Sequence, residues 1–311
     1  MKIFIVTPAP PGSRHGNRNT ALRWAAHLRA LGHRVAVQTA WQGDEADLLI
    51  ALHARRSHDA MAAWKKAHPR RPLVLVLTGT DLYRDIHSDR SAKASLALAD
   101  RLVVLQKEGL KELRRKASVI HQSVRPVKRG EPPAGHFLVT VIGHLREEKD
   151  PFRAALALRH LPEDVRVVQL GKALSPAMAS EARALMEKDS RYRWLGELPH
   201  AGAMRWLARS HAMVISSRME GGAHVVSEAI AAGVPVLASR ISGNVGLLGA
   251  RYPGYYPFGS ERALAKLIDH AHKDRAFLSR LEKRVKARRA LVRPATERQA
   301  LRALISAASE R

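Results

Sequence analysis

Short apolar runs alternate with amphipathic stretches along nearly the whole of the 311-residue chain. Apolar runs at residues 2–7, 35–37 and 48–52 are short enough for strands, and 72–77 is almost continuously apolar, as expected for a strand buried on both faces. Between the first two runs, residues 20–31 carry apolar side chains at the three- and four-residue spacing of a helix. Strands that alternate with helices in this way predict an α/β fold with a parallel sheet.

The alternation stops once and then starts again. Residues 126–136 are rich in proline and glycine, which is typical of a linker, and a new apolar strand follows at residues 137–142. We therefore predict a Rossmann-like domain over 1–125, a second one over 137–285 and a helical tail over 286–311. In a fold of this type, we expect the two domains to face each other across a ligand-binding cleft.

The net charge of +25 changes this picture, because so basic a chain is attracted to anionic partners. Aromatic residues make up only 5% of the sequence and no DNA- or RNA-binding motif stands out, so we expect no specific nucleic-acid partner. The chain has no cysteine and no run of about 18 apolar residues, which excludes disulfides and favours a cytoplasmic protein without a membrane span. The C-terminal helix could still touch an anionic membrane weakly through its basic residues, which are Arg280, Lys283, Arg284, Lys286, Arg288 and Arg289.

Polar residues follow two of the predicted strands of the first domain. After the first strand comes a long loop, residues 8–19, which contains Arg14, His15 and Arg18. After residues 72–77 comes the polar stretch Thr78–Asp85. Ligands of doubly wound sheets bind beyond the carboxyl ends of the strands, so both stretches are candidate binding loops. The alternative for the second is a plain capping turn, with Thr80 or Asp81 at the helix N-terminus.

Two carboxylates stand eight positions apart in residues 220–238 (EGGAHVVSEAIAAGVPVLA), and two glycines follow the first of them. A helix is predicted from about residue 223 to 232, and its N-terminus, approached over Gly221 and Gly222, suits a phosphate. Glu228, one to two turns into that helix, suits sugar or ribose hydroxyls. Alternatively, the acids are ordinary partners of the helix dipole and the glycines form a simple turn. His224 either faces the ligand or packs into the core.

These residues resemble GT-B glycosyltransferases of family 4 over essentially the whole chain. The resemblance is carried by residues 143–151 (GHLREEKDP) and by the Glu-x7-Glu block at 220–228. It implies that Arg146 and Lys149 bind the diphosphate of a UDP-sugar, that Glu220 contacts the donor sugar, and that Glu228 holds the ribose. It implies no metal and no cofactor. The remaining donor-binding residues that we predict are Gly16, Gly143, Gly221, Gly222, His224, Val226 and Ser227.

The first domain is more closely similar to selenosugar synthases of selenoneine biosynthesis, through residues 16–25 (GNRNTALRWA), 77–85 (LTGTDLYRD) and 98–106 (LADRLVVLQ). That resemblance implies a carbon–selenium bond formed between the anomeric carbon of UDP-N-acetylglucosamine and selenophosphate. We expect the anionic acceptor at Arg14, His15, Asn17, Arg18, Thr80, Asp81 and Arg84, and a catalytic group of Asp81, Arg146, Lys149 and Glu220. Two alternatives remain, namely a family 4 transferase with a sugar or lipid-linked hydroxyl acceptor at the inner membrane face, and a non-enzymatic basic protein that binds nucleotides or nucleic acid.

Overall fold

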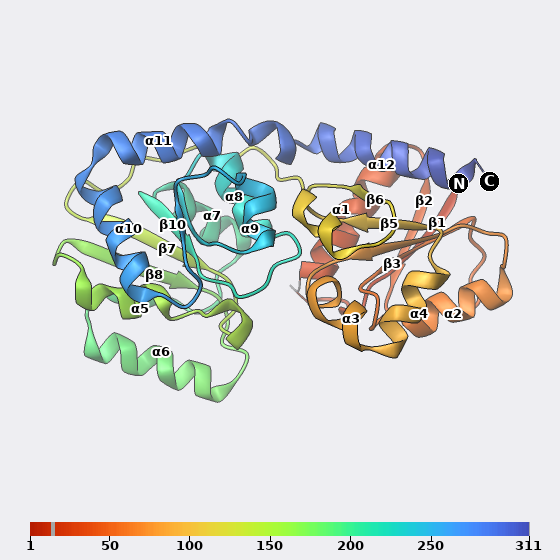
Figure 1. The fold of residues 1–311 in the computed structure, drawn as a ribbon, viewed down its shortest axis with the longest axis horizontal. Coiled ribbons are helices and arrows are strands. Elements are labelled where there is room, and N and C mark those ends of the chain that lie inside the picture. The colour runs from red at the N-terminus through yellow and green to blue at the C-terminus, as the bar shows by residue number, and fades with distance from the viewer. Residues whose placement is uncertain (14–15, 311) are drawn as a thin grey trace. The chain divides into compact units, whose positions relative to one another are not determined.

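The computed structural model describes residues 1–13 and 16–310 and divides by internal contacts into two compact units (Figure 1). Unit 1 comprises residues 1–123, 220–222 and 294–311, and unit 2 comprises residues 124–219 and 223–293. Each unit contains one six-stranded parallel sheet with helices. The two sheets confirm the predicted α/β class with two Rossmann-like domains.

The sheet of unit 1 has the strand order β2-β1-β3-β4-β5-β6. Its strands are β1 (Lys2–Val6), β2 (Arg34–Gln38), β3 (Leu48–Leu52), β4 (Leu73–Leu77), β5 (Arg101–Val104) and β6 (Ala117–Val119). The connecting helices are α1 (Gly16–Ala30), α2 (His58–Ala67), the π-helical turn η1 (Asp81–Asp85), α3 (Ile86–Ser88), α4 (Arg90–Leu98) and the 3-10 turn η2 (Lys107–Glu112). Because all strands are parallel, the loops that follow β1, β3 and β4 meet at one edge of the sheet.

Alternate residues of the first strand enter two different cores, as strand geometry requires. Ile3 and Ile5 belong to a cluster with Trp24 and Leu28 of α1 and with α12 (Pro294–Ser309). Phe4 belongs to the opposite cluster, which contains residues of α2 and β4. Helices therefore cover both faces of the sheet, which explains why β3 and β4 are apolar along their whole length.

The sheet of unit 2 has the order β12-β11-β10-β7-β8-β9. Its strands are β7 (Phe137–Ile142), β8 (Val165–Leu170), β9 (Tyr192–Trp194), β10 (Ala212–Ile215), β11 (Val236–Ser239) and β12 (Tyr255–Tyr256). Its helices and turns are η3 (Glu147–Lys149), α5 (Arg153–Ala157), η4 (Leu158–His160), α6 (Pro176–Lys188), α7 (His200–Ala208), α8 (His224–Ala232), α9 (Ser242–Leu248), α10 (Glu261–Lys273), α11 (Arg275–Lys286) and η5 (Arg289–Val292). The order changes direction between β10 and β7, so the loops after these two strands form the switch point at which doubly wound sheets bind ligands.

Two local predictions were wrong. The glycine-rich residues 242–246 (SGNVG) predict a loop after the strand at 235–239, but they begin helix α9, in which Gly243, Asn244 and Gly246 are buried and allow close packing. Helix α1 begins at Gly16, four residues before the expected start, so the polar residues Asn17 and Arg18 lie in its first turn. At α9, tertiary packing outweighs the low helix propensity of glycine and asparagine, whereas the first turn of α1 is exposed or only partly buried.

Two basic residues of the C-terminal stretch, Arg288 and Arg289, are integrated into the fold, whereas Arg280, Lys283, Arg284 and Lys286 are exposed. Arg288 donates to the carbonyls of Gly246 and Leu247 at the end of α9, and Arg289 donates to the carbonyl of Ile230 near the end of α8. Arg288 thereby satisfies carbonyl groups that the end of α9 leaves without an internal partner, and Arg289 adds a second donor to the Ile230 carbonyl, which also accepts the Gly233 amide. Over the described ranges, no helix combines the length and the apolar character needed to cross a membrane. The predicted membrane contact of this stretch stays a prediction.

Candidate functional site

In unit 2, the predicted diphosphate loop follows the switch-point strand β7 directly. A side chain on Gly171, after the neighbouring strand β8, would collide with the backbone of Gly143 and His144, so the two loops approach closely only because position 171 is glycine. Arg146 is half exposed and its Nε lies 3.9 Å from the Glu148 carboxylate. Lys149 is partly buried at the end of η3.

Hydrogen bonds from the loop after β10 hold this loop in place. The Ser216 hydroxyl donates to the carbonyl oxygen of Asp150 at 2.7 Å, and the Arg218 amide donates to that of Glu148 at 2.8 Å. Asp150 adopts a left-handed backbone conformation, with a φ of 45°. A small hollow of about 20 Å³ lies at this point, lined by residues that include Gly143, His144 and Lys149. The sheet thus presents two cations on a fixed loop at its switch point.

Helix α8 carries the second predicted acid, Glu228, which is buried. His200, at the start of α7, contacts its Oε1 through Nε2 at 2.7 Å, and Nε2 of His224 lies 3.6 Å from the same oxygen. The hydrogen bond with Glu228 raises the pKa of His200 above its usual value, against the opposing effect of partial burial. The carboxylate that we predicted to accept hydrogen bonds from ribose hydroxyls therefore already accepts one from His200.

The other predicted residues of α8 differ in what their side chains can reach. No side chain caps the helix N-terminus, which leaves its first amide groups available to an anion. Ser227 is buried, and its hydroxyl has no hydrogen-bond partner within the part of the chain that the structure describes. Val226, by contrast, is fully buried in the hydrophobic core of unit 2.

Residues 220–222 group by their contacts with unit 1. Glu220 is 9% exposed. A side chain on Gly221 would collide with the carbonyl of Thr78, and the Gly222 carbonyl accepts a hydrogen bond from the side chain of Gln122. A side chain on Gly222 would collide with the Cβ atom of Leu105, so close packing requires glycine at both positions, in addition to the ligand approach for which we predicted them.

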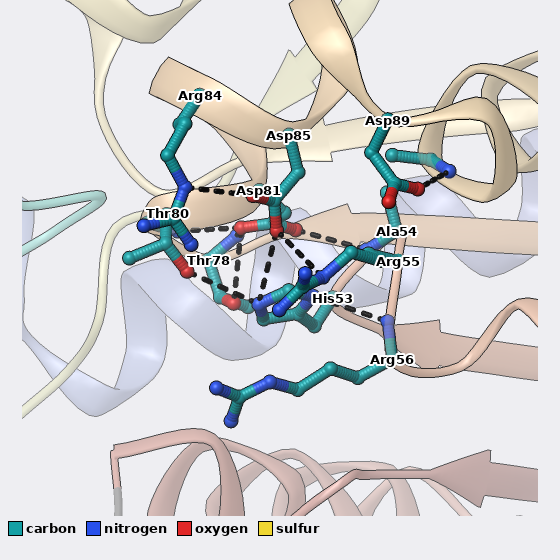
Figure 2. A network of polar contacts seen from close by, with 12 residues as sticks. His53, Ala54, Arg55, Arg56, Thr78, Thr80, Asp81, Arg84, Asp85 and Asp89 are labelled. Atoms are coloured by element: carbon teal, nitrogen blue, oxygen red, sulfur yellow. Dashed lines mark hydrogen bonds and ion pairs between the residues drawn. The ribbon is translucent and has the colours of Figure 1, made fainter.

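In unit 1, Asp81 lies at the centre of the polar network that Figure 2 shows. Its side chain is completely buried, and its two oxygens accept backbone amides of Thr78 at 2.9 Å, Gly79 at 2.8 Å and Ala54 at 3.0 Å. Asp81 therefore fixes the loop after β4 and ties it to the loop after β3. These contacts give it a role in shaping the site, and its predicted catalytic role stays a prediction.

The remaining predicted acceptor residues lie on the loops after β1 and β4. Thr80 contacts His53, and Arg84 forms an ion pair with the buried Asp85. Asn17 and Arg18 lie in the first turn of α1, beside Gly16. Arg14 and His15 lie outside the described residues.

Sequence reasoning missed several polar residues of both units. In unit 1 these are His53, Arg55 and Arg56, which follow the buried strand β3, and Asp85. The rule that directed attention to the loop after β4 would also have found the residues after β3. His200 is 28 residues away from Glu228 along the chain, and no local sequence pattern indicated their contact.

Titratable side chains do not gather into a metal site in the described regions. Within residues 1–13 and 16–310, no group of three or more histidine, aspartate or glutamate side chains is arranged to hold a metal ion. This arrangement of side chains does not test whether the reaction needs a metal ion, so the absence of a metal requirement stays a prediction.

A family model described as "Glycosyl transferases group 1" matches residues 127–288, which is more than half of the chain. The matched region includes the loop with Arg146 and Lys149 and helix α8 with Glu228. No curated protein matches the sequence.

Solved structures of glycosyltransferases share the fold. The Anabaena protein Alr3699/HepE, solved with UDP and glucose, gives a TM-score of 0.80 at 18% identity over 99% of this chain and 100% of its own. Sucrose-phosphate synthase from Thermosynechococcus elongatus gives 0.78 at 16% identity over 98% and 99%. A glycosyltransferase from Rickettsia africae gives 0.72 at 15% identity over 99% and 98%. At such low identity these similarities establish the GT-B fold alone.

Proposed function

We propose that this chain, which belongs to the family of glycosyl transferases group 1, transfers a sugar from a UDP-sugar to an anionic selenium acceptor of the selenophosphate type. The observation that carries the donor half is the braced loop after β7, which presents Arg146 and Lys149 at the switch point of unit 2. UDP as the carrier is supported by the similar Anabaena structure, which was solved with UDP and with UDP-glucose.

The donor half of the site favours departure of a diphosphate. When the bond between the anomeric carbon and the UDP oxygen breaks, negative charge develops on the leaving diphosphate. Fixed cations aimed at that charge stabilise the transition state, which is the role we assign to Arg146 and Lys149. We assign the ribose to Glu228 and Ser227, which is supported by the Ser227 hydroxyl having no hydrogen-bond partner among the described residues. The uncapped N-terminus of α8 would add amide donors.

The acceptor half is proposed from the resemblance of residues 16–25 and 77–85 to selenosugar synthases. In the proposed step, the selenium of selenophosphate forms a bond to the anomeric carbon while UDP leaves with the bonding electrons. A nucleophile that already carries negative charge needs no side chain to remove a proton, unlike a sugar hydroxyl. A reaction without a general base is supported by the contacts of Asp81 in the predicted acceptor loop, because its carboxylate accepts hydrogen bonds from backbone amides.

The reaction can be tested directly with the full-length protein. Incubation with UDP-N-acetylglucosamine and selenophosphate should release UDP and yield a sugar with the isotope pattern of selenium in its mass spectrum. Release of UDP with hydroxyl acceptors alone would reject the selenium acceptor, and would leave a family 4 transferase of the ordinary kind.

A matched pair of lysine variants tests the donor half separately. Lys149→Ala should lower kcat/KM by about 100-fold or more, the typical cost of removing a group that stabilises developing charge. Lys188→Ala removes the same charge from an exposed position at the end of α6 and should leave the rate within about twofold of wild type. Equal rates for both variants would exclude Lys149 from the donor site.

A further inference from the structure

Four arginines follow three neighbouring strands of unit 1. Arg18 lies in the first turn of α1, which the loop after β1 precedes; Arg55 and Arg56 follow β3; and Arg84 lies in η1 after β4. Because β1, β3 and β4 are adjacent and parallel, all four belong to the carboxyl edge of one sheet. We propose that Arg55 and Arg56, which the sequence analysis did not select, act with Arg18 and Arg84 to bind a tetrahedral oxyanion of the phosphate class. This site would hold the acceptor, and to that extent the proposal rests on the proposed function.

Asp85 holds two of the guanidinium groups next to each other. Its side chain is 4% exposed, and it contacts Nε of Arg84 at 2.9 Å and Nε of Arg55 at 3.3 Å (Figure 2). Both arginines use Nε for this contact, and their terminal nitrogens have no partner among the described residues. A guanidinium group fixed in this way keeps its terminal N–H groups for an oxyanion, to which it can donate two parallel hydrogen bonds.

Arg56 is fixed at its backbone and extends freely at its tip. Its amide donates to Nδ1 of His53 at 3.4 Å, while the side chain is exposed and forms no ion pair within the described regions. Figure 2 shows the Arg56 side chain extending away from Asp85, with no contact to the other residues drawn. A cation without a carboxylate partner is the group in this cluster that an incoming anion would neutralise first.

His53 connects the two loops and is held in a strained conformation. Its φ is 77°, in the left-handed region that residues other than glycine rarely adopt. Its Nε2 lies 3.2 Å from the Thr80 hydroxyl, so one imidazole spans from the loop after β3 to the loop after β4. Burial is the main cause that lowers its pKa, which keeps the ring neutral at pH 7. Such strain is retained where the surrounding structure needs the geometry, and here it sets the backbone of Arg56.

The balance of charge favours an anion. Arg55 and Arg84 share the buried carboxylate of Asp85, and Arg56 forms no ion pair among the described residues. These three cations outnumber the buried carboxylates Asp81 and Asp85 by one before Arg18 is counted. Arg18 adds a buried terminal nitrogen that lacks a hydrogen-bond partner among the described residues. A buried donor without a partner is costly, and an oxyanion at this edge would satisfy it.

The test measures phosphate binding to the full-length protein by isothermal titration calorimetry, with saturating UDP present to occupy the diphosphate loop of unit 2. Arg56→Ala should weaken the binding of inorganic phosphate at least tenfold, because it removes a charge-assisted hydrogen bond. Arg56→Lys should retain part of the affinity, since the charge remains and the fork is lost. Arg70→Ala is the matched control, because Arg70 is equally exposed but precedes β4 and therefore lies toward the opposite edge of the same sheet. It should bind phosphate within about twofold of wild type.

Unchanged phosphate binding in Arg56→Ala and Arg55→Ala would overturn the proposal. An equal loss of binding in Arg70→Ala would also overturn it, because the loss would then come from the lower net charge and not from a local site. Because Arg56 is exposed, its replacement should leave the unfolding temperature unchanged, and this is checked in parallel. The outcome is separable from that of the proposed function. Loss of phosphate binding in Arg56→Ala without selenosugar formation by the wild type would support the anion site and reject selenophosphate as the acceptor.

Discussion

The contact between His200 and Glu228 affects whether the Glu228 carboxylate, predicted to bind ribose, is free to accept a hydrogen bond from a ligand. The imidazole is largely exposed, and the carboxylate is buried, yet their atoms are 2.7 Å apart. Any hydroxyl that binds Glu228 must share the carboxylate with His200 or displace it. The protonation state of His200 therefore influences the availability of Glu228.

Because the pKa of His200 is raised in the folded protein, the pair stabilises the fold with a definite dependence on pH. Its contribution is complete below the unfolded pKa of about 6.5 and is lost as the pH rises through the higher folded pKa. An ion pair exposed on one side contributes at most about 1 kcal/mol after solvent screening. His200→Gln should therefore lower the unfolding temperature by roughly 1–3 °C at pH 5.5 and by less at pH 9.

Thermal unfolding at the two pH values, followed by circular dichroism, checks this expectation. His160→Gln is the control, since His160 is exposed at the end of η4 and has no contact with a carboxylate in the described structure. An equal loss of stability in His200→Gln at both pH values would show that the contact is not an ion pair.

For single residues, sequence patterns predicted which side chains belong to the site better than they predicted which residues those side chains contact. The Glu-x7-Glu spacing placed Glu228 on a helix, because spacing along one helix is a local property. The contact of Glu228 with His200 joins α8 to α7, and the contact of Arg55 with Asp85 joins two loops. Contacts of this kind depend on how elements pack, which a single sequence does not encode in any short pattern.

The C-terminal helix α12 is attached to the rest of unit 1 through one buried carboxylate. Glu297 is 1% exposed and accepts hydrogen bonds from Nε of Arg23 at 2.9 Å, from Nε1 of Trp24 at 2.8 Å and from the amide of Ser123 at 3.0 Å. Burial alone would raise its pKa, but the hydrogen bonds from His27, Arg23 and Ser123 hold the pKa at about 2. One carboxylate thus joins α12 to α1 and to the end of the segment after β6.

Removal of this carboxylate should destabilise unit 1. The pKa lies about 2.5 units below the ordinary glutamate value of 4.5, which corresponds to about 3 kcal/mol of stability at pH 7. This contribution is present above pH 4.5 and is lost as the pH falls toward 2. Glu297→Gln should therefore lower the free energy of unfolding by about 3 kcal/mol at pH 7 and by much less at pH 2.5.

Urea denaturation followed by tryptophan fluorescence measures the effect, since Trp24 contacts Glu297 directly. Glu187→Gln serves as the control, because Glu187 is exposed on α6 and should change the unfolding free energy by less than about 0.5 kcal/mol. A Glu297→Gln protein as stable as wild type at pH 7 would contradict a stabilising role for this cluster.

Most helices and strands could be predicted from hydrophobic periodicity, and the failures have a common cause. The short apolar run at residues 165–170, which ends at Gly171, predicts a strand, and β8 occupies these residues. Helix α9 was missed because Ser242, Gly243, Asn244 and Gly246 favour loops, and only their burial against other elements makes them helical. Arg288 and Arg289, which donate to carbonyls of α9 and α8, were predicted as part of a basic membrane-contacting helix, because no pattern marks an arginine that donates to distant carbonyls.

Across the whole molecule, the net charge of +25 produces self-repulsion that salt should relieve. The screening length falls from about 30 Å at 0.01 M ionic strength to about 8 Å at 0.15 M. The unfolding temperature in sodium chloride should therefore rise by a few degrees between these two concentrations. A fall of the unfolding temperature over the same range would mean that attractive ion pairs outweigh the repulsion between like charges.

Helix α12 lies at the end of the chain but packs on strands from its beginning, and this affects how the chain folds during synthesis. The core of unit 1 includes Leu301, Leu304 and Ile305, together with strands made from the first half of the chain. All of unit 2, together with residues 220–222 of unit 1, is translated between these two parts. Unit 1 therefore leaves the ribosome with an open hydrophobic face, and this face is covered only after unit 2 has been made. A chain that stops before α12 would lose the folding of its first domain, although every strand of that domain would be present.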